Sequence, residues 1–336
     1  MATISGTDSG APRANPARTL IGAVVGATVL LLVILCAFAL PQVKGGPNGV
    51  PLGVAGPQQV VGALQGRLPA DAWDVRTYGD ARALQNAIKE REVLGGLAVG
   101  ADGLTVYTAT AGGQQAAAAI SSLGQAMAAQ QQVRVTVEDV VPFPADDPRG
   151  VGFTASLFPL IIGGILPAVL LLRLFPGPAA LGLRLAGVLL FALVAGFSVV
   201  AVLQYGFGSL AGNYWLTSLG LALGMAALSV PLLALGSLLG LPGLGLGAAV
   251  MVLLGNPLSG MAGPYWLPSG WAAFGQLLPP GATGSLVRAV AFFDGTGAAA
   301  PAVVLGGWVL AGLLLLLAAG RRAARDTQAQ AAPAAA

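Results

Sequence analysis

Five uncharged apolar runs limit what this chain can fold into more than any other feature. They cover residues 19–40, 153–172, 185–205, 216–239 and 302–319. Each is about 20 residues long, the length that a helix needs to cross a hydrocarbon core of about 30 Å. Charged residues make up only 9% of the 336 residues and the mean hydropathy is +0.80, whereas about a quarter of the residues of a soluble protein are charged. The sequence therefore predicts a polytopic α-helical membrane protein.

A sixth apolar segment breaks before it can cross. Leu244 to Leu254 is continuously apolar, but about 11 helical residues at about 1.5 Å each reach only about half of the hydrocarbon core. Gly255, Asn256 and Pro257 follow, and proline disfavours helix at the residue before it. A second apolar piece, residues 265–278, carries the aromatic side chains of Tyr265, Trp266 and Trp271, which are typical of a membrane interface. We expect a fifth helix that is broken, with a re-entrant return, and six transmembrane helices in total.

Residues 41–150 have a different composition, because they hold eight of the sixteen basic and ten of the thirteen acidic residues. Apolar periodicity predicts the order β-α-β-α-β-β-α-β, with strands at 50–55, 73–78, 97–99, 104–108 and 133–141 and helices at 58–68, from 80, and at 113–132. Asp80 is a candidate N-cap, and Leu84 and Ile88 form the apolar stripe of the helix that follows. We expect a water-exposed α+β domain between transmembrane helices 1 and 2.

The chain divides at these boundaries into five parts. They are a tail at 1–18, helix 1 at 19–40, the α+β domain at 41–150, helices 2–6 at 151–320 with the broken helix 5 and its re-entrant segment, and a second tail at 321–336. A cleaved signal peptide is the rival interpretation of the first run, because Ala37-Phe38-Ala39 resembles a cleavage site. Its apolar core is longer than that of a signal peptide, which favours a helix.

The arginines of the short segments predict the orientation. They fall on one side of the membrane if the chain crosses six times, and they are Arg13, Arg18, Arg173, Arg184, Arg321, Arg322 and Arg325. Because basic residues concentrate in cytoplasmic loops, we expect both termini in the cytoplasm, the α+β domain outside, and a multi-pass protein of the cell membrane.

The composition also excludes several kinds of site. The chain has no histidine and one cysteine, Cys36, which removes Cys/His zinc sites, histidine-based triads and intramolecular disulfides. The acidic pairs Glu138-Asp139 and Asp146-Asp147 lack the spacing of metal ligands, and we interpret them as solvated surface. No acidic residue, histidine or lysine lies within a span, so a proton or sodium relay lacks a titratable group. We expect no catalytic residues, metal or cofactor on this chain, and no nucleic-acid partner.

The expected topology is a cytoplasmic tail, one helix, a large external domain and five further helices. This topology resembles the permease subunit of ABC-2-type exporters. The resemblance is greatest to the actinobacterial branch, which is related to the phage-infection-protein family. The motifs that carry the resemblance are Gly255-Asn256-Pro257-Leu258-Ser259-Gly260, Leu267-Pro268, Leu278-Pro279-Pro280-Gly281-Ala282, Arg288 and Phe292-Phe293-Asp294-Gly295. The resemblance implies a separate ABC ATPase, a homo- or heterodimer of permeases, and contact with the ATPase through the loop 174–183. The short first tail departs from the family, whose members have an amphipathic interface helix before helix 1.

Two groups of residues are the candidate functional positions. The ATPase-coupling loop is bounded by Arg173 and Arg184 and stiffened by Pro176 and Pro178. The outer gate comprises the helix breakers of the re-entrant region and one arginine: Asn256, Pro257, Pro268, Pro279, Pro280 and Arg288. Arg288 could orient a phosphate or carboxylate of the substrate, although an arginine of an interfacial helix that extends to the membrane surface explains it more simply.

Two functions from different classes follow. The first is export of an amphipathic or lipid-like substrate, with ATP hydrolysed elsewhere, since no P-loop sequence occurs in this chain. The second is a non-transporting membrane protein whose external domain serves as an envelope assembly factor or receptor. An enzyme is not expected, because the spans contain no pair of nucleophile and base.

Overall fold

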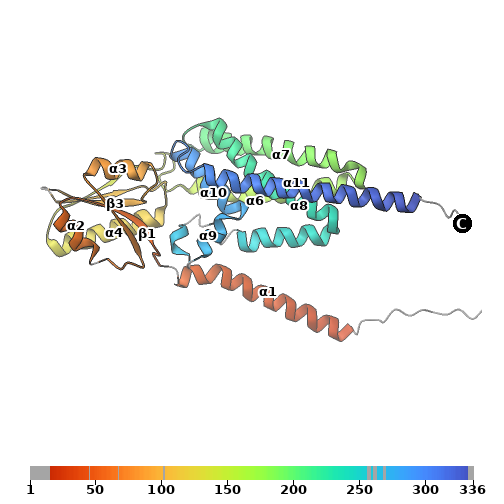
Figure 1. Cartoon of the computed structure of the whole chain (residues 1–336), viewed down its shortest axis with the longest axis horizontal. Helices are drawn as coiled ribbons and strands as arrows, with labels where there is room; N and C mark the ends of the chain where they lie inside the picture. The colour runs from red at the N-terminus through yellow and green to blue at the C-terminus, as the bar shows by residue number, and fades with distance from the viewer. Residues whose placement is uncertain are drawn as a thin grey trace, which may run out of the picture.

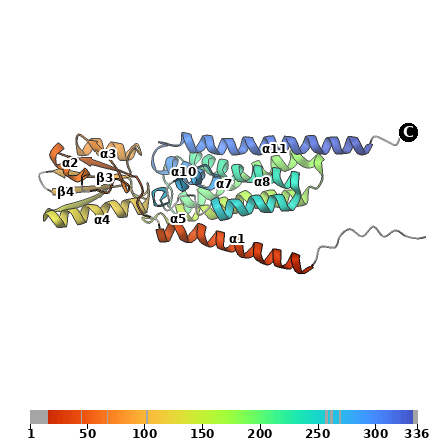
Figure 2. The ribbon, with the colours of Figure 1, turned by 60° about the horizontal axis from the view of Figure 1, so that its bottom comes forward.

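The computed structural model describes residues 16–44, 46–66, 68–100, 103–255, 259, 263–267 and 270–331. A sheet domain, Val50 to Asp139, stands at one end of an elongated molecule, and long helices make up the rest (Figure 1). The N-terminal end of α1 and the C-terminal end of α11 both lie at the opposite end (Figure 2).

The sheet domain contains five strands in the order β2-β1-β3-β4-β5. The β1–β2, β1–β3 and β4–β5 pairs are parallel, whereas β3 and β4 form an antiparallel hairpin. The strands are β1 (Val50–Ala55), β2 (Trp73–Tyr78), β3 (Gly95–Gly100), β4 (Gly103–Thr108) and β5 (Val135–Asp139), and the helices are α2 (Gln58–Gln65), α3 (Ala81–Lys89) and α4 (Gln114–Gln131). The element order predicted from the sequence is confirmed.

Helices cover both faces of this sheet. Leu84 and Ile88 of α3 are buried on one face, and Ile120 of α4 packs with Leu52 and Val106 on the other. Asp80 caps α3, because its carboxylate accepts a hydrogen bond from the Ala83 amide at 2.8 Å. The predicted N-cap and apolar stripe are therefore confirmed.

Glycines in β1 and β3 let α3 approach the sheet closely. A Cβ at Gly53 would lie 2.1 Å from Cδ1 of Leu84, and a Cβ at Gly96 would lie 2.7 Å from the same atom. Side chains at either position would displace α3, because interiors are packed without space for additional atoms.

Four helical segments among the described residues are long and apolar enough to cross a membrane. They are Val151–Leu174, Pro178–Gly206, Tyr214–Leu253 and Ala299–Asp326. The structure is thus a mostly helical membrane-type architecture with a small mixed-sheet domain, and the count of six spans stays a prediction. The helices of this part are α5 (Val151–Ala155), α6 (Leu157–Leu174), α7 (Leu181–Ala201), α8 (Tyr214–Val250), α9 (Trp271–Gln276), α10 (Pro279–Phe292) and α11 (Ala299–Ala331).

Helix α8 forms two arms that turn at Gly240. This residue has φ 70° and ψ −161°, a backbone conformation that is almost exclusive to glycine. A Cβ at Gly236, before the turn, would lie 3.4 Å from Cβ of Leu244, and one at Gly247 would lie 2.8 Å from Cδ2 of Leu232. The second arm therefore returns along the first, as the separate runs 216–239 and 244–254 predicted (Figure 1).

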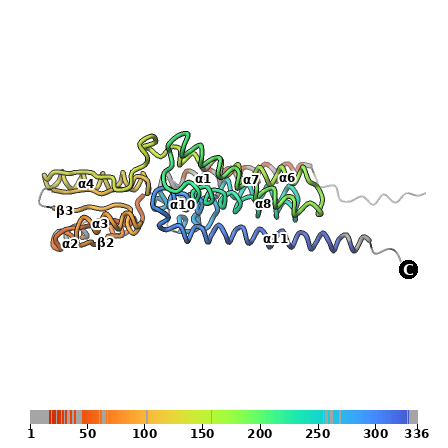
Figure 3. Tube along the Cα trace, turned by 90° about the horizontal axis from the view of Figure 1, so that it is seen from above, coloured from red at the N-terminus to blue at the C-terminus, as the bar shows by residue number. Residues whose placement is uncertain are grey.

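The first arm of α8 is the centre of the helical part. It packs against α6, α7, α10 and α11, and small residues shape these contacts. A Cβ at Gly224 would lie 2.3 Å from Oγ1 of Thr283 in α10, and one at Gly312 of α11 would lie 2.7 Å from the backbone nitrogen of Pro231. Helix α11 runs along the whole length of this part (Figure 3).

Helix α1 (Pro16–Lys44) lies apart from the other helices over most of its length (Figures 1 and 2). Its apolar side chains are exposed, Leu20 and Leu31 at 65% each. A Cβ built on Gly22 or Gly26, two glycines four residues apart on this helix, would meet no described atom within 4 Å. The predicted helix is present, and its small-residue face has no contact within the part of the chain that the structure describes.

Candidate functional site

The break after the second arm of α8 begins with a π-helical turn, Met251–Gly255. Of the predicted outer-gate residues, Asn256, Pro257 and Pro268 lie outside the described residues. Pro279 and Pro280 occupy the first two positions of α10, where proline is favoured because its fixed φ suits a helix and its missing N–H is not needed. These two prolines therefore start the helix that follows the break.

Helix α10 is buried along nearly its whole length. Thr283 fits against Gly224 of α8, and a Cβ at Gly281 would lie 2.3 Å from the carbonyl oxygen of Gly275. Arg288 of this helix is only 7% exposed. The expectation of an interfacial helix whose arginine extends to the membrane surface is thus wrong, because α10 is enclosed by α8, α11 and α9.

The segment before α9 is attached to the sheet domain. The Asn48 amide donates to the carbonyl oxygen of Tyr265 at 3.0 Å, and Tyr265 and Trp266 pack against the α4 side of the sheet domain. The interfacial position expected from the sequence stays a prediction, and the structure adds that these aromatic rings cover apolar residues of the domain.

The C-terminal end of α10 reaches the same domain. Phe293 is 5% exposed and packs with Ile88 of α3. Phe292 makes edge-to-face contacts with Phe143 at 5.3 Å and with Phe153 at 5.6 Å between ring centroids. Edge-to-face pairs of this kind stabilise beyond their buried area. Helix α10 is consequently held at one end by α8 and at the other by the sheet domain.

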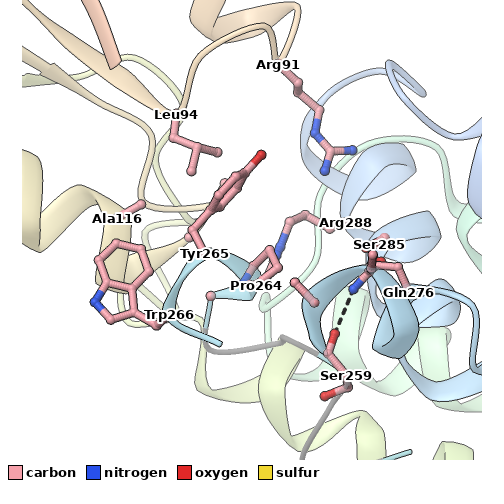
Figure 4. Close-up of a pocket in the computed structure, with 15 residues that line it drawn as sticks. Arg91, Leu94, Ala116, Ser259, Pro264, Tyr265, Trp266, Gln276, Ser285 and Arg288 are labelled. Atoms are coloured by element: carbon pink, nitrogen blue, oxygen red, sulfur yellow. Dashed lines mark hydrogen bonds between the residues drawn. The ribbon is translucent and has the colours of Figure 1, made fainter. Parts of the chain in front are cut away.

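A pocket of about 320 Å³ lies between the sheet domain and the α9–α10 region. Arg91 and Leu94 line it from the domain, Tyr265 from the connecting segment, and Gln276 and Arg288 from the helices (Figure 4). The segment after the break therefore lines a cavity that the sheet domain covers.

Arg91 reaches the pocket from the turn after α3. It has φ 60°, its Nη1 donates to the carbonyl oxygen of Thr296 at 3.2 Å, and its guanidinium lies 5.1 Å from the ring centroid of Phe293. Burial lowers the pKa of Arg91 from its ordinary value, but arginine remains charged at neutral pH. The domain thus contributes a fixed positive charge to the pocket.

Arg288 contributes the second positive charge. Its guanidinium lies 5.0 Å from the ring centroid of Phe153, a cation–π distance. The neighbouring polar side chains are ordered, since the Ser285 hydroxyl donates to Oε1 of Gln276 at 2.6 Å and Nε2 of Gln276 donates to the Ser259 carbonyl at 2.8 Å. None of the fifteen described residues that line the pocket is Asp or Glu, so the charged side chains among them are both positive.

The predicted coupling loop lies at the opposite end of the molecule, between α6 and α7. Arg173 is exposed in the last turn of α6, whereas Arg184 is 5% exposed. Arg184 donates from Nε to the carbonyl oxygen of Phe175 at 2.7 Å and from Nη2 to that of Gly177. Pro176 is exposed, and Pro178 starts a short 3-10 turn, Pro178–Ala180. The loop is short, proline-rich and fastened from within by one buried arginine.

Asp147 joins the sheet domain to the helices, which the sequence analysis missed. It is 9% exposed, and its carboxylate accepts hydrogen bonds from the amides of Val151 at 2.9 Å and Gly152 at 2.7 Å. Burial alone would raise the pKa of Asp147, but these amides and the Ser209 hydroxyl lower it more. The interpretation of Asp146-Asp147 as solvated surface is therefore wrong for Asp147. The sequence does contain a signal for this role, because an acidic residue just before a predicted helix can accept hydrogen bonds from the first amides of that helix.

Arg91 was also missed, because nothing in the local sequence shows that the end of α3 meets a helix about 200 residues later. Within the described ranges no three His, Cys, Asp or Glu residues come close enough to hold a metal ion. Comparisons with protein-family models, with curated proteins and with solved structures found no match.

Proposed function

We propose that this chain is the membrane-spanning permease subunit of an ABC-2-type exporter, which moves an amphipathic or lipid-like substrate outward with ATP hydrolysed by a separate subunit. The observation that carries the proposal is the position of α10. One end of this buried helix contacts the central helix α8 through Thr283, and the other inserts Phe293 into the sheet domain. In this proposal α10 transmits a movement of the helices to the domain that covers the pocket.

The proposed membrane arrangement has six crossings. They are made by α1, α5–α6, α7, the first arm of α8, the second arm of α8 together with the chain that follows it to the sheet domain, and α11. Its support is that the α6–α7 loop and the C-terminal end of α11 lie at the end opposite the sheet domain (Figure 1), and both carry arginines. The second arm with its π-helical turn, residues 241–255, is about 22 Å long at about 1.5 Å per residue. It would therefore end inside the membrane, below the sheet domain. Both termini are cytoplasmic in this arrangement.

The proposed ATPase contact is the loop 174–183. A coupling loop must transmit a push without deforming, and two hydrogen bonds from Arg184 hold this loop to α7. Hydrogen bonds from a charged donor are stronger than neutral ones. The permease would act as a homo- or heterodimer, and α1 offers an exposed apolar surface to lipid or to the second permease.

Replacement of Arg184 by lysine tests this coupling. Lysine keeps the positive charge but lacks the planar fork that reaches two carbonyl groups. We expect a P-loop ATPase to co-purify with the wild-type chain and to hydrolyse ATP faster in its presence. Arg184→Lys should retain the ATPase and lose most of the stimulation. Arg322→Lys is the control, because Arg322 is an exposed arginine near the same end of the molecule. Equal stimulation of the ATPase by the wild type and both variants, or no ATPase in the complex, would contradict the proposal.

One observation favours the second function, a non-transporting assembly factor or receptor. Strand β5 is at the edge of the sheet, and Val133, Val135 and Val137 on or beside it are 41%, 38% and 47% exposed. An exposed apolar edge strand fits a partner that adds a strand to the sheet. An envelope protein that co-purifies through residues 46–150, together with the absence of an ATPase, would favour this function over export.

A further inference from the structure

We propose that the pocket between Arg91 and Arg288 binds an oxyanion of the phosphate class, as the headgroup of an amphiphile. The inference goes beyond the exporter proposal, because binding requires only the pocket and holds whether the ligand is transported or not. It rests on the charge, the fixed geometry and the size of the pocket.

The charge of the pocket favours an anion. Two arginines line one cavity. Like charges at short range repel, and a partly desolvated site strengthens that repulsion. An oxyanion between them would convert repulsion into two attractions. Uncharged polar groups complete the lining, with Ser285, Gln276 and Tyr265.

Both guanidinium groups are held in position without a ligand. The Arg91 guanidinium rests on Phe293 and is bonded to Thr296, and that of Arg288 rests on Phe153. Planar guanidinium groups match the geometry of phosphate oxygens. Because ordering side chains opposes binding, two arginines that are already ordered give a tighter site than mobile ones would.

The size and lining of the pocket point to a headgroup with the beginning of an apolar tail. A volume of about 320 Å³ is at the small end for ligand pockets and is too small for a whole lipid. Apolar side chains line the pocket beside the arginines, from Leu94, Ala116, Pro264, Trp266, Ala272 and Ala273. Figure 4 shows Leu94 and Trp266 on the Tyr265 side of the cavity, with the arginines on the other. A tail would leave on the side of these apolar residues.

The alternative is that both arginines serve only to join the sheet domain to the helices. Binding to the purified full chain in a neutral detergent separates the two explanations. The probes are dioctanoyl phosphatidic acid, its uncharged counterpart dioctanoylglycerol, and inorganic phosphate. We expect saturable binding of phosphatidic acid, measured by calorimetry, at least tenfold tighter than that of dioctanoylglycerol. Arg91→Gln and Arg288→Gln should each weaken it at least tenfold, or about 1.4 kcal/mol.

Arg82→Gln, which removes an exposed arginine of the same domain, should bind as the wild type does. Tighter binding of phosphatidic acid than of inorganic phosphate would identify a lipid headgroup, and equal binding would identify free phosphate. Should Arg288→Gln fail to fold, Arg91→Gln decides the matter. The proposal is overturned if neither anion binds, if dioctanoylglycerol binds equally well, or if the folded arginine variants bind like the wild type.

Discussion

Asp147→Asn tests whether the sheet domain is rigidly joined to the helices. The Asp147 carboxylate accepts from two amides, those of Val151 and Gly152, whereas asparagine has one acceptor oxygen and presents its NH₂ group to the second amide. A hydrogen bond to a charged group contributes about 1.5–3 kcal/mol. We therefore expect the free energy of unfolding to fall by about 1.5–3 kcal/mol.

The pH dependence of this effect has a definite sign. Because the folded structure lowers the pKa of Asp147, the ionised form stabilises the protein above the ordinary carboxyl pKa of about 3.9. The stabilisation is lost as the pH falls through the lowered pKa of the folded state. The difference between wild type and Asp147→Asn should hence be constant from about pH 8 to about pH 5 and should shrink only in stronger acid.

The measurement is equilibrium unfolding of the purified protein in detergent, followed by tryptophan fluorescence. Limited proteolysis of the linker between β5 and α5 gives a second readout, which should be faster in the variant. Asp146→Asn is the matched control, because Asp146 is the exposed neighbour. Equal destabilisation by both substitutions, or a difference that grows with acidity, would refute the reasoning.

Two further predictions concern the turn of α8 and the orientation. Gly240→Ala should destabilise the protein by about 1–3 kcal/mol, because the backbone conformation of Gly240 is strained for any other residue. Gly245→Ala is the control and should have little effect on thermal unfolding, because a Cβ at Gly245 would meet no described atom within 4 Å. Equal shifts of the unfolding temperature in the two variants would contradict the prediction. With Cys36 replaced by serine, a cysteine at Ser122 should react with an impermeant thiol reagent in intact cells and one at Asp326 only after permeabilisation. The reverse pattern would show that the proposed orientation is wrong.

Local patterns were sufficient to predict the sheet domain. The alternation of Val50, Leu52 and Val54 encodes a strand, and the spacing of Leu84 and Ile88 after Asp80 encodes a capped amphipathic helix. Both depend on residues close in sequence, whose side chains must fall on one face of the element. The apolar runs predicted the long helices for the same reason.

The candidate site could not be predicted in this way, because its parts are distant in sequence. Arg288 resembled a surface arginine, since an apolar helix with a single charge is equally consistent with an interface and with a buried site. Only the structure shows that Arg91 faces the same cavity. The contact of Tyr265 and Trp266 with the sheet domain was missed, because an aromatic pair beside prolines is consistent with a membrane surface as well as with a second domain.

Crosslinking from the α6–α7 loop tests the central claim most directly. Ala179 is exposed within the short turn Pro178–Ala180, and a photoactivatable crosslinker on a cysteine at this position would react with whatever docks there in native membranes. The account predicts a crosslinked product that contains a P-loop ATPase, identified by mass spectrometry, and no such product from a cysteine at Ser122 in the sheet domain. An ATPase that co-purifies with the chain but is captured from Ser122, or from neither position, would contradict the account.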